Sequence, residues 1–222
     1  MRWRSGGSHP LFARFFDRVA ARDEERGQAD LRRQLLAGLS GLVVEVGAGN
    51  GLNFAHFPRT VDQVLAVEPE PYLRRRAVLA AAGAPVPVRV VAGVADRLPV
   101  ADGCAGGVVL SGVLCSVPDE AAALAEVRRA LGPGGEVRFY EHVRPEGAVR
   151  GRLHDALDGA WSRAMGGCHI NRRTVETIAG AGFDLSQVRS FTFPPGTRLS
   201  PPAVKVMGVA RPAPARVMSP GR

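Results

Sequence analysis

The order of segments along the chain predicts an α/β fold, in which a mainly parallel sheet lies between two layers of helices. Between residues 41 and 142, short apolar runs that suit buried strands alternate with segments of helical periodicity. Such alternation is typical of a parallel sheet that is covered on both faces. Beyond residue 142, two more strands joined by a proline-rich loop are expected to form an antiparallel hairpin at the sheet edge. The sequence therefore predicts a three-layer sandwich with a seven-stranded sheet.

The N-terminal segment is expected to be helical. Apolar side chains, among them Phe12 and Phe16, recur at helical spacing from residue 11 to residue 39. A charged stretch ending at Gly27 interrupts this pattern, so two helices or one kinked helix are both possible. We interpret residues 1–40 as a helical cap on a core of residues 41–211, together forming a single domain. Residues 212–222, which are rich in proline, are expected to be a disordered tail.

Local signals set the limits of the other elements. Pro71 suits the first turn of a helix, Asp119 can cap the next one, and glycines at 132–135 and 182 end helices. The expected strands are residues 42–46, 64–68, 85–91, 108–111, 136–142, 188–193 and 203–210. The expected helices are residues 51–56, 72–82, 120–131, 150–165 and 174–181.

The composition excludes some classes of protein. The net charge is +8, but Lys205 is the single lysine among 29 basic residues, and the arginines are scattered, so we expect no nucleic-acid partner. Three cysteines without a C-x-x-C pair indicate neither a disulfide framework nor a metal site. The N-terminus lacks the apolar segment of a signal peptide, and no apolar run approaches the roughly 18 residues that a bilayer crossing needs. We therefore expect a cytoplasmic protein without a transmembrane segment.

A glycine-rich turn follows the first expected strand. The strand carries Glu45 near its end, and glycines at 47, 49 and 51 follow it, where a ligand can approach a backbone without Cβ atoms. The second strand ends in Glu68, about 20 residues further on, the distance at which a βαβ unit presents a carboxylate to a ribose. These features predict an adenosine-type cofactor at the carboxyl ends of parallel strands. An ordinary strand–helix turn remains the plainer alternative.

The spacing of the glycines separates the possible cofactors. A dinucleotide fingerprint reads G-x-G-x-x-G, whereas the third glycine here arrives one residue early. No Gly-Lys-Ser/Thr follows, which excludes a P-loop. Acid-x-Gly-x-Gly-x-Gly is the pattern of the class I S-adenosylmethionine (SAM) methyltransferases, which residues 45–51 closely resemble. The resemblance implies SAM as the cofactor and a Rossmann-like sheet of five parallel strands with an antiparallel pair.

The resemblance also implies a set of cofactor-binding positions. Glu68 would bond the ribose hydroxyls, Pro69 would pack near the adenine, and the segment after the third strand would hold the adenine edge. The family often has an aspartate where Val94 stands, so Ala95 would offer a backbone amide instead, and Asp96 is either a contact or a solvated loop residue. The full set is Glu45, Gly47, Ala48, Gly49, Asn50, Gly51, Glu68, Pro69, Val94, Ala95, Asp96 and Ser111.

Further sequence motifs narrow the resemblance to one subgroup of the family. Val113-Leu114-Cys115-Ser116-Val117, Glu141-His142 and Gly167-Cys168-His169 resemble the thiol S-methyltransferases of the methyltransferase-like group, and quinone methyltransferases share the more general marks. The Asp/Asn-Pro-Pro-aromatic motif of nucleic-acid amino-methyltransferases is absent. The sequence therefore predicts methyl transfer to a small, apolar thiol, hydroxyl or activated carbon by in-line displacement. A non-catalytic SAM-binding protein and an NAD-dependent oxidoreductase remain as alternatives.

Residues on the acceptor side are expected mainly from their positions. His142, at a strand end, and His169, in a polar loop, are the candidate catalytic residues, although each also suits a structural role. Cys115 is either a nucleophile or a small buried hydrophobe, and the phenylalanines either cap the pocket or form a core stripe. The candidate acceptor-binding residues are Phe12, Phe16, Leu114, Cys115, Glu141, Cys168 and Asn171.

Overall fold

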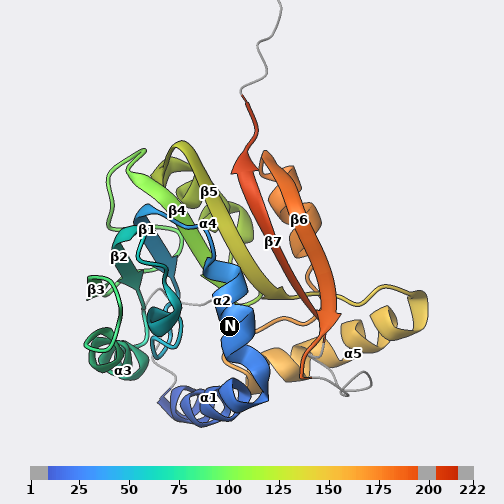
Figure 1. Ribbon diagram of the computed structural model, residues 1–222. Coiled ribbons are helices and arrows are strands. Elements are labelled where there is room, and N and C mark those ends of the chain that lie inside the picture. The colour runs from blue at the N-terminus through green and yellow to red at the C-terminus, as the bar shows by residue number, and fades with distance from the viewer. Residues whose placement is uncertain (1–9, 195–203, 215–222) are drawn as a thin grey trace, which may run out of the picture.

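A seven-stranded sheet forms the centre of the computed structural model, which describes residues 10–194 and 204–214 (Figure 1). The strand order is β3-β2-β1-β4-β5-β7-β6, in which the first five strands pair in parallel and β7 is antiparallel to both of its neighbours, β5 and β6. The strands are β1 (Gly41–Val46), β2 (Val61–Val67), β3 (Val88–Val91), β4 (Ala105–Ser111), β5 (Leu131–His142), β6 (Phe183–Thr192) and β7 (Val204–Pro212). The predicted Rossmann-like sheet with an antiparallel C-terminal pair is confirmed.

Helices cover both faces of the sheet because each strand exposes apolar side chains on both sides. On one face, α2 (Ala29–Leu36) and α3 (Pro71–Ala81) pack against β1 and β2, burying Leu36 and Ala77. On the other face, α4 (Glu120–Ala130) and α6 (Thr174–Gly180) bury Leu124 and Ile178. Side-chain oxygens of Glu70 and Asp119 cap α3 and α4.

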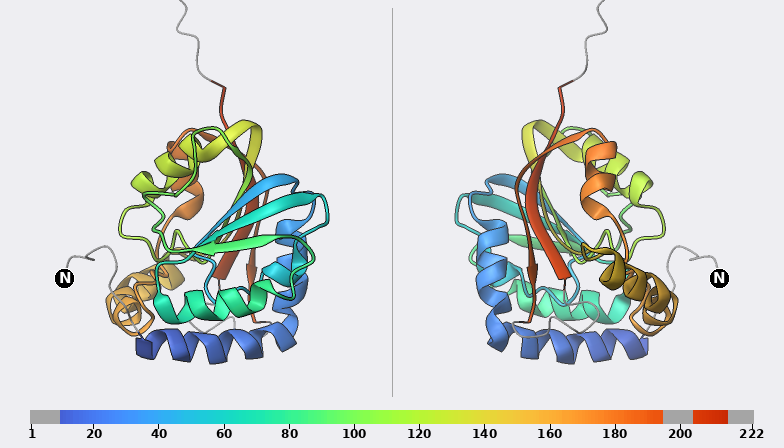
Figure 2. Two further views of the ribbon diagram at one scale, coloured as in Figure 1. Left: turned by 90° about the vertical axis from the view of Figure 1, so that its left-hand side faces the viewer. Right: turned by 90° about the vertical axis from the view of Figure 1, so that its right-hand side faces the viewer.

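Two further helices lie across the edge of the sheet at which β1, β2, β4 and β5 end. These are α1 (Pro10–Asp23) and α5 (Ala148–Ala164), seen at the lower edge in Figures 1 and 2. A short π-helical segment, Glu24–Gln28, joins α1 to α2, and Gly27 adopts a φ of 102° within it. The interruption predicted from the sequence is therefore a bend between two helices. It lets α2 pack along the sheet while α1 crosses its carboxyl edge.

Three predicted boundaries were wrong for identifiable physical reasons. The helix expected at residues 51–56 is only one 3₁₀ turn, Phe54–His56, because Gly51 has a positive φ and Pro58 follows. The strand expected from Pro85 starts at Val88, since Pro85 and Pro87 lack the N–H that a ladder needs. The tail was expected from residue 212, but Pro212 belongs to β7 and Ala213 N–H donates to the Gly182 carbonyl. Residues 215–222, and most of the loop expected at 194–202, lie outside the described residues.

Candidate cofactor and acceptor site

The glycine-rich turn runs directly from β1 at the carboxyl edge of the sheet. Gly47 and Ala48 donate their N–H groups to the Val67 carbonyl, at 2.8 and 3.1 Å, which ties the turn to the end of β2. Gly47 has a φ of +65°, and an added Cβ would lie 2.9 Å from Val113 Cγ2. Glycine is therefore required at position 47 for two reasons: the backbone conformation, and the close approach of the loop that follows β4.

Glu68 lies beside this turn, at the end of β2. Its carboxylate accepts hydrogen bonds from the N–H groups of Gly49 (2.7 Å) and Glu70 (2.8 Å). Burial raises the pKa of Glu68 to about 7, although both hydrogen bonds act in the opposite direction. A carboxylate oxygen can accept more than one hydrogen bond, so this group retains capacity for a ligand hydroxyl. The two features predicted to lie together, the glycine turn and Glu68, are in direct contact.

Glu45 is buried in β1, and only one of its two carboxylate oxygens has a hydrogen-bond partner. Its Oε1 accepts a hydrogen bond from Asn53 Nδ2 at 2.7 Å, and Asn53 Oδ1 accepts one from Arg32 of α2 at 2.7 Å. Its Oε2 is one of four buried side-chain atoms, among the residues described, without a hydrogen-bond partner. Burial raises the pKa of Glu45 to about 7. A buried, unpartnered carboxylate oxygen next to a glycine turn is a place where a polar ligand group can be satisfied.

The burial of Glu45 predicts a measurable pH dependence. Its pKa is higher in the folded protein than in the unfolded chain, so the folded state binds more protons between about pH 4.5 and pH 7. This carboxyl therefore lowers stability as the pH rises through that window. The variant Glu45→Gln should gain stability relative to the wild type by on the order of 2–3 kcal/mol between pH 4.5 and pH 7.5. Urea unfolding at several pH values measures this, with exposed Asp62→Asn as a control that should show no such gain.

The residues expected around an adenine are more exposed. Pro69 and Asp96 lie at the surface, whereas Val94 and Ala95 are half-buried in the turn after β3. Val94 O accepts a hydrogen bond from Arg97 N–H at 3.2 Å, which closes this turn. Ser111 is half-buried at the end of β4. All five lie at the carboxyl ends of neighbouring strands, as the sequence predicts, and their contacts with a cofactor stay predictions.

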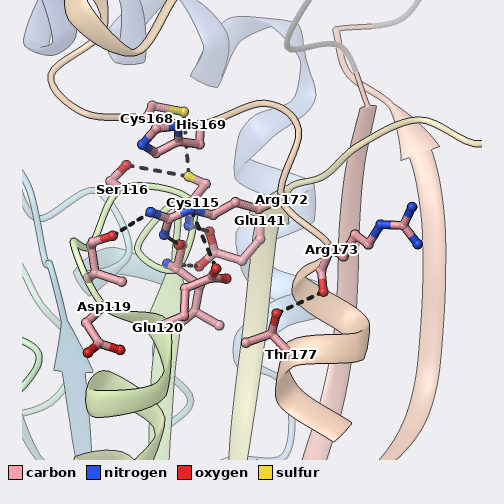
Figure 3. Close-up of polar contacts among 12 residues, drawn as sticks. Cys115, Ser116, Asp119, Glu120, Glu141, Cys168, His169, Arg172, Arg173 and Thr177 are labelled. Carbon is pink, nitrogen blue, oxygen red and sulfur yellow. Dashed lines mark hydrogen bonds and ion pairs between the residues drawn. The ribbon is translucent and has the colours of Figure 1, made fainter. Parts of the chain in front are cut away.

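The loop that follows β4, residues 113–117, is held in place by Glu141 and Arg172 (Figure 3). The buried Glu141 carboxylate accepts hydrogen bonds from the N–H groups of Val113, Leu114 and Cys115, at 2.9, 3.0 and 3.1 Å. The expectation that Glu141 and Leu114 contact an acceptor needs correction. Glu141 directs its carboxylate to backbone amides, and neither side chain has exposed surface. Glu141 therefore positions the loop, and the Leu114 side chain packs in the hydrophobic core.

The segment after α5 packs directly onto this loop. Arg172 donates to the carbonyls of Leu114 and Val117, the latter at 2.7 Å, and His169 N–H donates to the Cys115 carbonyl at 2.6 Å. The polar stretch of residues 168–172, which contains the candidate residues Cys168, His169 and Asn171, is thus fixed against the loop that follows β4. Figure 3 shows Cys168 and His169 above Cys115 and Ser116.

Two cysteines and a histidine meet between these segments, and we call them the thiol–imidazole cluster: Cys115, His142 and Cys168. The two Sγ atoms are 3.6 Å apart, and His142 Nδ1 lies 3.6 Å from Cys115 Sγ and 3.5 Å from Cys168 Sγ. Hydrogen bonding with Cys168, together with burial, raises the pKa of the Cys115 thiol to about 12, which argues against the nucleophile interpretation. Burial, together with the charge of Lys205, lowers the pKa of His142.

His169 and Asn171 turn towards α5 instead of towards the cluster. His169 Nδ1 lies 2.7 Å from Asp158 Oδ2, and its Nε2 lies 3.4 Å from Ser162 Oγ. Hydrogen bonds from Arg144 and, to a lesser extent, from the Asn171 side chain lower the pKa of the Asp155 carboxyl. Both ring nitrogens of His169 are therefore engaged by α5. The prediction of a catalytic His169 is not supported by this geometry, which instead gives the residue a structural role.

Helix α1 closes the carboxyl edge over the glycine turn. An added Cβ at Gly49 would lie 3.4 Å from the Phe16 ring, and one at Gly166 would lie 2.5 Å from the Phe12 ring. The two rings lie 6.0 Å apart and so bridge the glycine turn and the end of α5. Phe16 is 36% exposed, so these side chains cap the edge and do not form a core stripe.

Asp17 attaches α1 to the cofactor side of the site. Its carboxylate accepts hydrogen bonds from Asn50 Nδ2 (2.8 Å) and Tyr72 Oη (3.2 Å), and it pairs with Arg76 at 3.3 Å. The variant Asp17→Ala should loosen α1, with about tenfold faster amide exchange across Pro10–Asp23, because two hydrogen bonds and an ion pair are lost. Hydrogen-exchange mass spectrometry measures this. Unchanged exchange would show that the aromatic contacts alone hold the helix.

Several residues at the site were not predicted from the sequence: Asp17, Arg32, Asn53, Arg172 and Lys205. Each of the first four has at least one partner 21 to 58 positions away, which spacing along the chain does not indicate. Lys205 is the one residue of this set that the sequence could have indicated, because it is the single lysine in an arginine-rich chain. It is half-buried in β7, and its Nζ lies 2.5 Å from His142 Nε2.

Comparison with known proteins agrees with this geometry. A family model described as a methyltransferase domain matches residues 44–139. Human thiol S-methyltransferase TMT1B is 32% identical over 79% of this chain and 73% of that protein. Human thiol S-methyltransferase TMT1A is 32% identical over 72% of this chain and 68% of that protein. The chain belongs to the class I SAM-dependent methyltransferases. SAM is accordingly the cofactor of this methyltransferase.

Solved structures support the same fold. An S-adenosylmethionine-dependent methyltransferase from Mesorhizobium loti matches with a TM-score of 0.60 and 21% identity, over 82% of this chain and 96% of that one. The YcgJ protein from Bacillus subtilis matches with a TM-score of 0.65 and 16% identity, over 84% of this chain and 98% of that one. Within residues 10–194 and 204–214, no helix of this methyltransferase has the length and apolar content to cross a membrane.

Proposed function

We propose that this methyltransferase moves the methyl group of SAM to the sulfur of a small, apolar thiol. One observation carries the proposal: the glycine turn and the loop that follows β4 touch each other, at Gly47 and Val113. A donor held by the turn would therefore face whatever lies beside Cys115. The relatives TMT1A and TMT1B are named thiol S-methyltransferases, and they match 72% and 79% of this chain. This favours a thiol over a hydroxyl or an activated carbon.

The residues at the glycine turn fit SAM. The turn lacks the Cβ atoms that would fill the space along its backbone, and Glu68 keeps the capacity to bond ribose hydroxyls. The unpartnered Oε2 of Glu45 suits a cationic group such as the amino group of the methionine part. We propose that the cofactor-binding residues are those predicted from the sequence, with Asn50 fixed by Asp17.

Transfer requires little chemistry from the protein itself. When bound, SAM supplies a methyl group that its sulfonium already activates, so alignment and exclusion of water dominate. Phe12 and Phe16 exclude water from above the turn, while Glu141 and Arg172 fix the loop on the acceptor side. A thiol reacts as its thiolate, so the site also has to remove a proton from the acceptor.

A methyl-acceptor assay tests this proposal. The protein is incubated with SAM that carries a trideuterated methyl group, together with matched small thiols, phenols and quinols of similar size. We expect a deuterated thioether and an equal amount of S-adenosylhomocysteine, seen by mass spectrometry. Products from phenols or quinols alone would contradict the thiol proposal. SAM binding without any product would favour the non-catalytic alternative.

A further inference from the structure

The thiol–imidazole cluster brings together three possible metal ligands, one fewer than the four that tetrahedral zinc takes. We propose that Cys115, His142 and Cys168 bind a zinc ion and that the acceptor thiolate takes the fourth position. The second part rests on the proposed function, whereas the first part stands on geometry alone. The three ligand atoms all lie within 4.8 Å of one another. No metal site was predicted, because the three ligands come from separate segments of the chain and share no spacing motif.

The distances match tetrahedral zinc. With Zn–S bonds of about 2.3 Å and Zn–N bonds of about 2.0–2.1 Å, tetrahedral angles place two sulfurs about 3.8 Å apart and sulfur and nitrogen about 3.5–3.6 Å apart. The observed separations are 3.6 Å for the two Sγ atoms, and 3.6 and 3.5 Å from each Sγ to His142 Nδ1. The three atoms therefore form one face of a tetrahedron of the right size.

The surroundings hold these ligands in place. Glu141 accepts from Cys115 N–H, and His169 N–H donates to the Cys115 carbonyl, so the backbone on either side of this thiol is fixed. Nδ1 of His142 faces the two sulfurs, while Nε2, which carries the proton of the neutral imidazole when Nδ1 binds a metal, lies 2.5 Å from Lys205 Nζ. Two thiolates and a neutral imidazole form a ligand set of the kind that zinc takes in catalytic sites, where three protein ligands leave the fourth position to water or substrate.

A bound zinc ion would explain how the acceptor thiol loses its proton. Coordination favours the thiolate over the thiol, and the displaced proton passes to solvent. A lone pair of the zinc-bound sulfur then forms the new carbon–sulfur bond. The carbon–sulfonium bond breaks, and its electron pair returns to the cofactor sulfur, which becomes a neutral thioether. The methylated acceptor is also a neutral thioether, a weaker ligand than a thiolate, and so it can leave the metal.

Cobalt substitution tests the site without any assay of activity. Protein reduced with a phosphine is titrated with Co²⁺ and then with competing Zn²⁺. We expect thiolate-to-cobalt charge-transfer bands together with the strong visible bands of tetrahedral Co²⁺, both abolished by stoichiometric Zn²⁺. The variant Cys168→Ser should weaken Zn²⁺ binding by at least about 100-fold. Cys104→Ser, at the opposite end of β4, is the matched control and should leave the spectrum unchanged.

Different outcomes separate the two proposals. Wild-type protein without a tetrahedral thiolate spectrum would overturn the metal site, as would a Cys115–Cys168 disulfide that persists in the reduced protein. Should Cys168→Ser fail to fold, His142→Gln provides the same comparison, with thermal unfolding as the check on folding. Addition of ethanethiol to the cobalt protein should change the charge-transfer bands, and an unchanged spectrum would overturn binding at the fourth position. A metal site without thiol methylation would contradict only the proposed function.

Discussion

Replacement of Glu68 by glutamine is expected to weaken SAM binding by about 10- to 100-fold. A hydrogen bond to a charged group contributes about 1.5–3 kcal/mol, and the carboxylate at this position is proposed to bond both ribose hydroxyls. In the wild type, the Glu68 carboxylate accepts hydrogen bonds from the N–H groups of Gly49 and Glu70. The amide of glutamine has only one oxygen, so its NH₂ group would face one of these two N–H donors. Isothermal titration calorimetry with SAM and with S-adenosylhomocysteine measures the change.

The matched control for this variant is Asp62→Asn, on the same strand. Asp62 is an exposed carboxylate near the start of β2, whereas Glu68 follows its last residue. Both substitutions remove one negative charge, so a general electrostatic effect would appear in both. We expect the affinity of Asp62→Asn to stay within about twofold of the wild type. Unchanged affinity of Glu68→Gln would remove this residue from the cofactor site.

Replacement of Glu141 by alanine is expected to cause the largest loss of stability at the site, about 2–4 kcal/mol. Three N–H groups of the loop that follows β4 would lose their acceptor, and each buried unsatisfied donor costs about 1–3 kcal/mol before the loop relaxes. In the wild type, burial of the Glu141 carboxylate is unfavourable and raises the pKa of this group. The substitution removes this unfavourable burial, which offsets part of the loss. Urea unfolding measures the net change.

The consequence for activity follows from where the loop lies. A loosened loop should raise KM for the acceptor and lower kcat, while SAM affinity stays within about threefold, because the glycine turn has its own hydrogen bonds to β2. Glu136→Ala, on the same strand, is the matched control. Its carboxylate pairs with the side chains of Arg138 and Arg211 and not with backbone amides of the loop, so its loss should lower stability without raising KM for the acceptor. An equal rise in KM in the two variants would contradict the positioning role.

The sheet and the cofactor side of the site were predictable because local patterns encode them. Apolar runs placed the parallel strands, and the glycine turn with Glu68 indicated the ligand, since a strand end followed by residues without Cβ atoms has few other uses. Boundaries failed where tertiary contacts or prolines decide them, as at Val88 and in the single turn Phe54–His56.

The acceptor side was only partly predictable because its contacts join distant segments. His142, Cys115 and Cys168 were each singled out, but their meeting within 3.6 Å depends on how the segment after α5 folds back over β4 and β5. Glu141 was assigned to the acceptor from its position at a strand end, although its carboxylate serves three backbone amides. A strand-end position thus indicates proximity to the site, and it does not tell which group faces the ligand.

The most direct test of the proposed site is a crystal structure of the protein with S-adenosylhomocysteine. The account predicts ribose hydroxyls bonded to Glu68, the amino acid part along residues 47–51, and the sulfur facing the thiol–imidazole cluster. A nucleoside bound elsewhere would contradict it, and so would a sulfur turned away from Cys115.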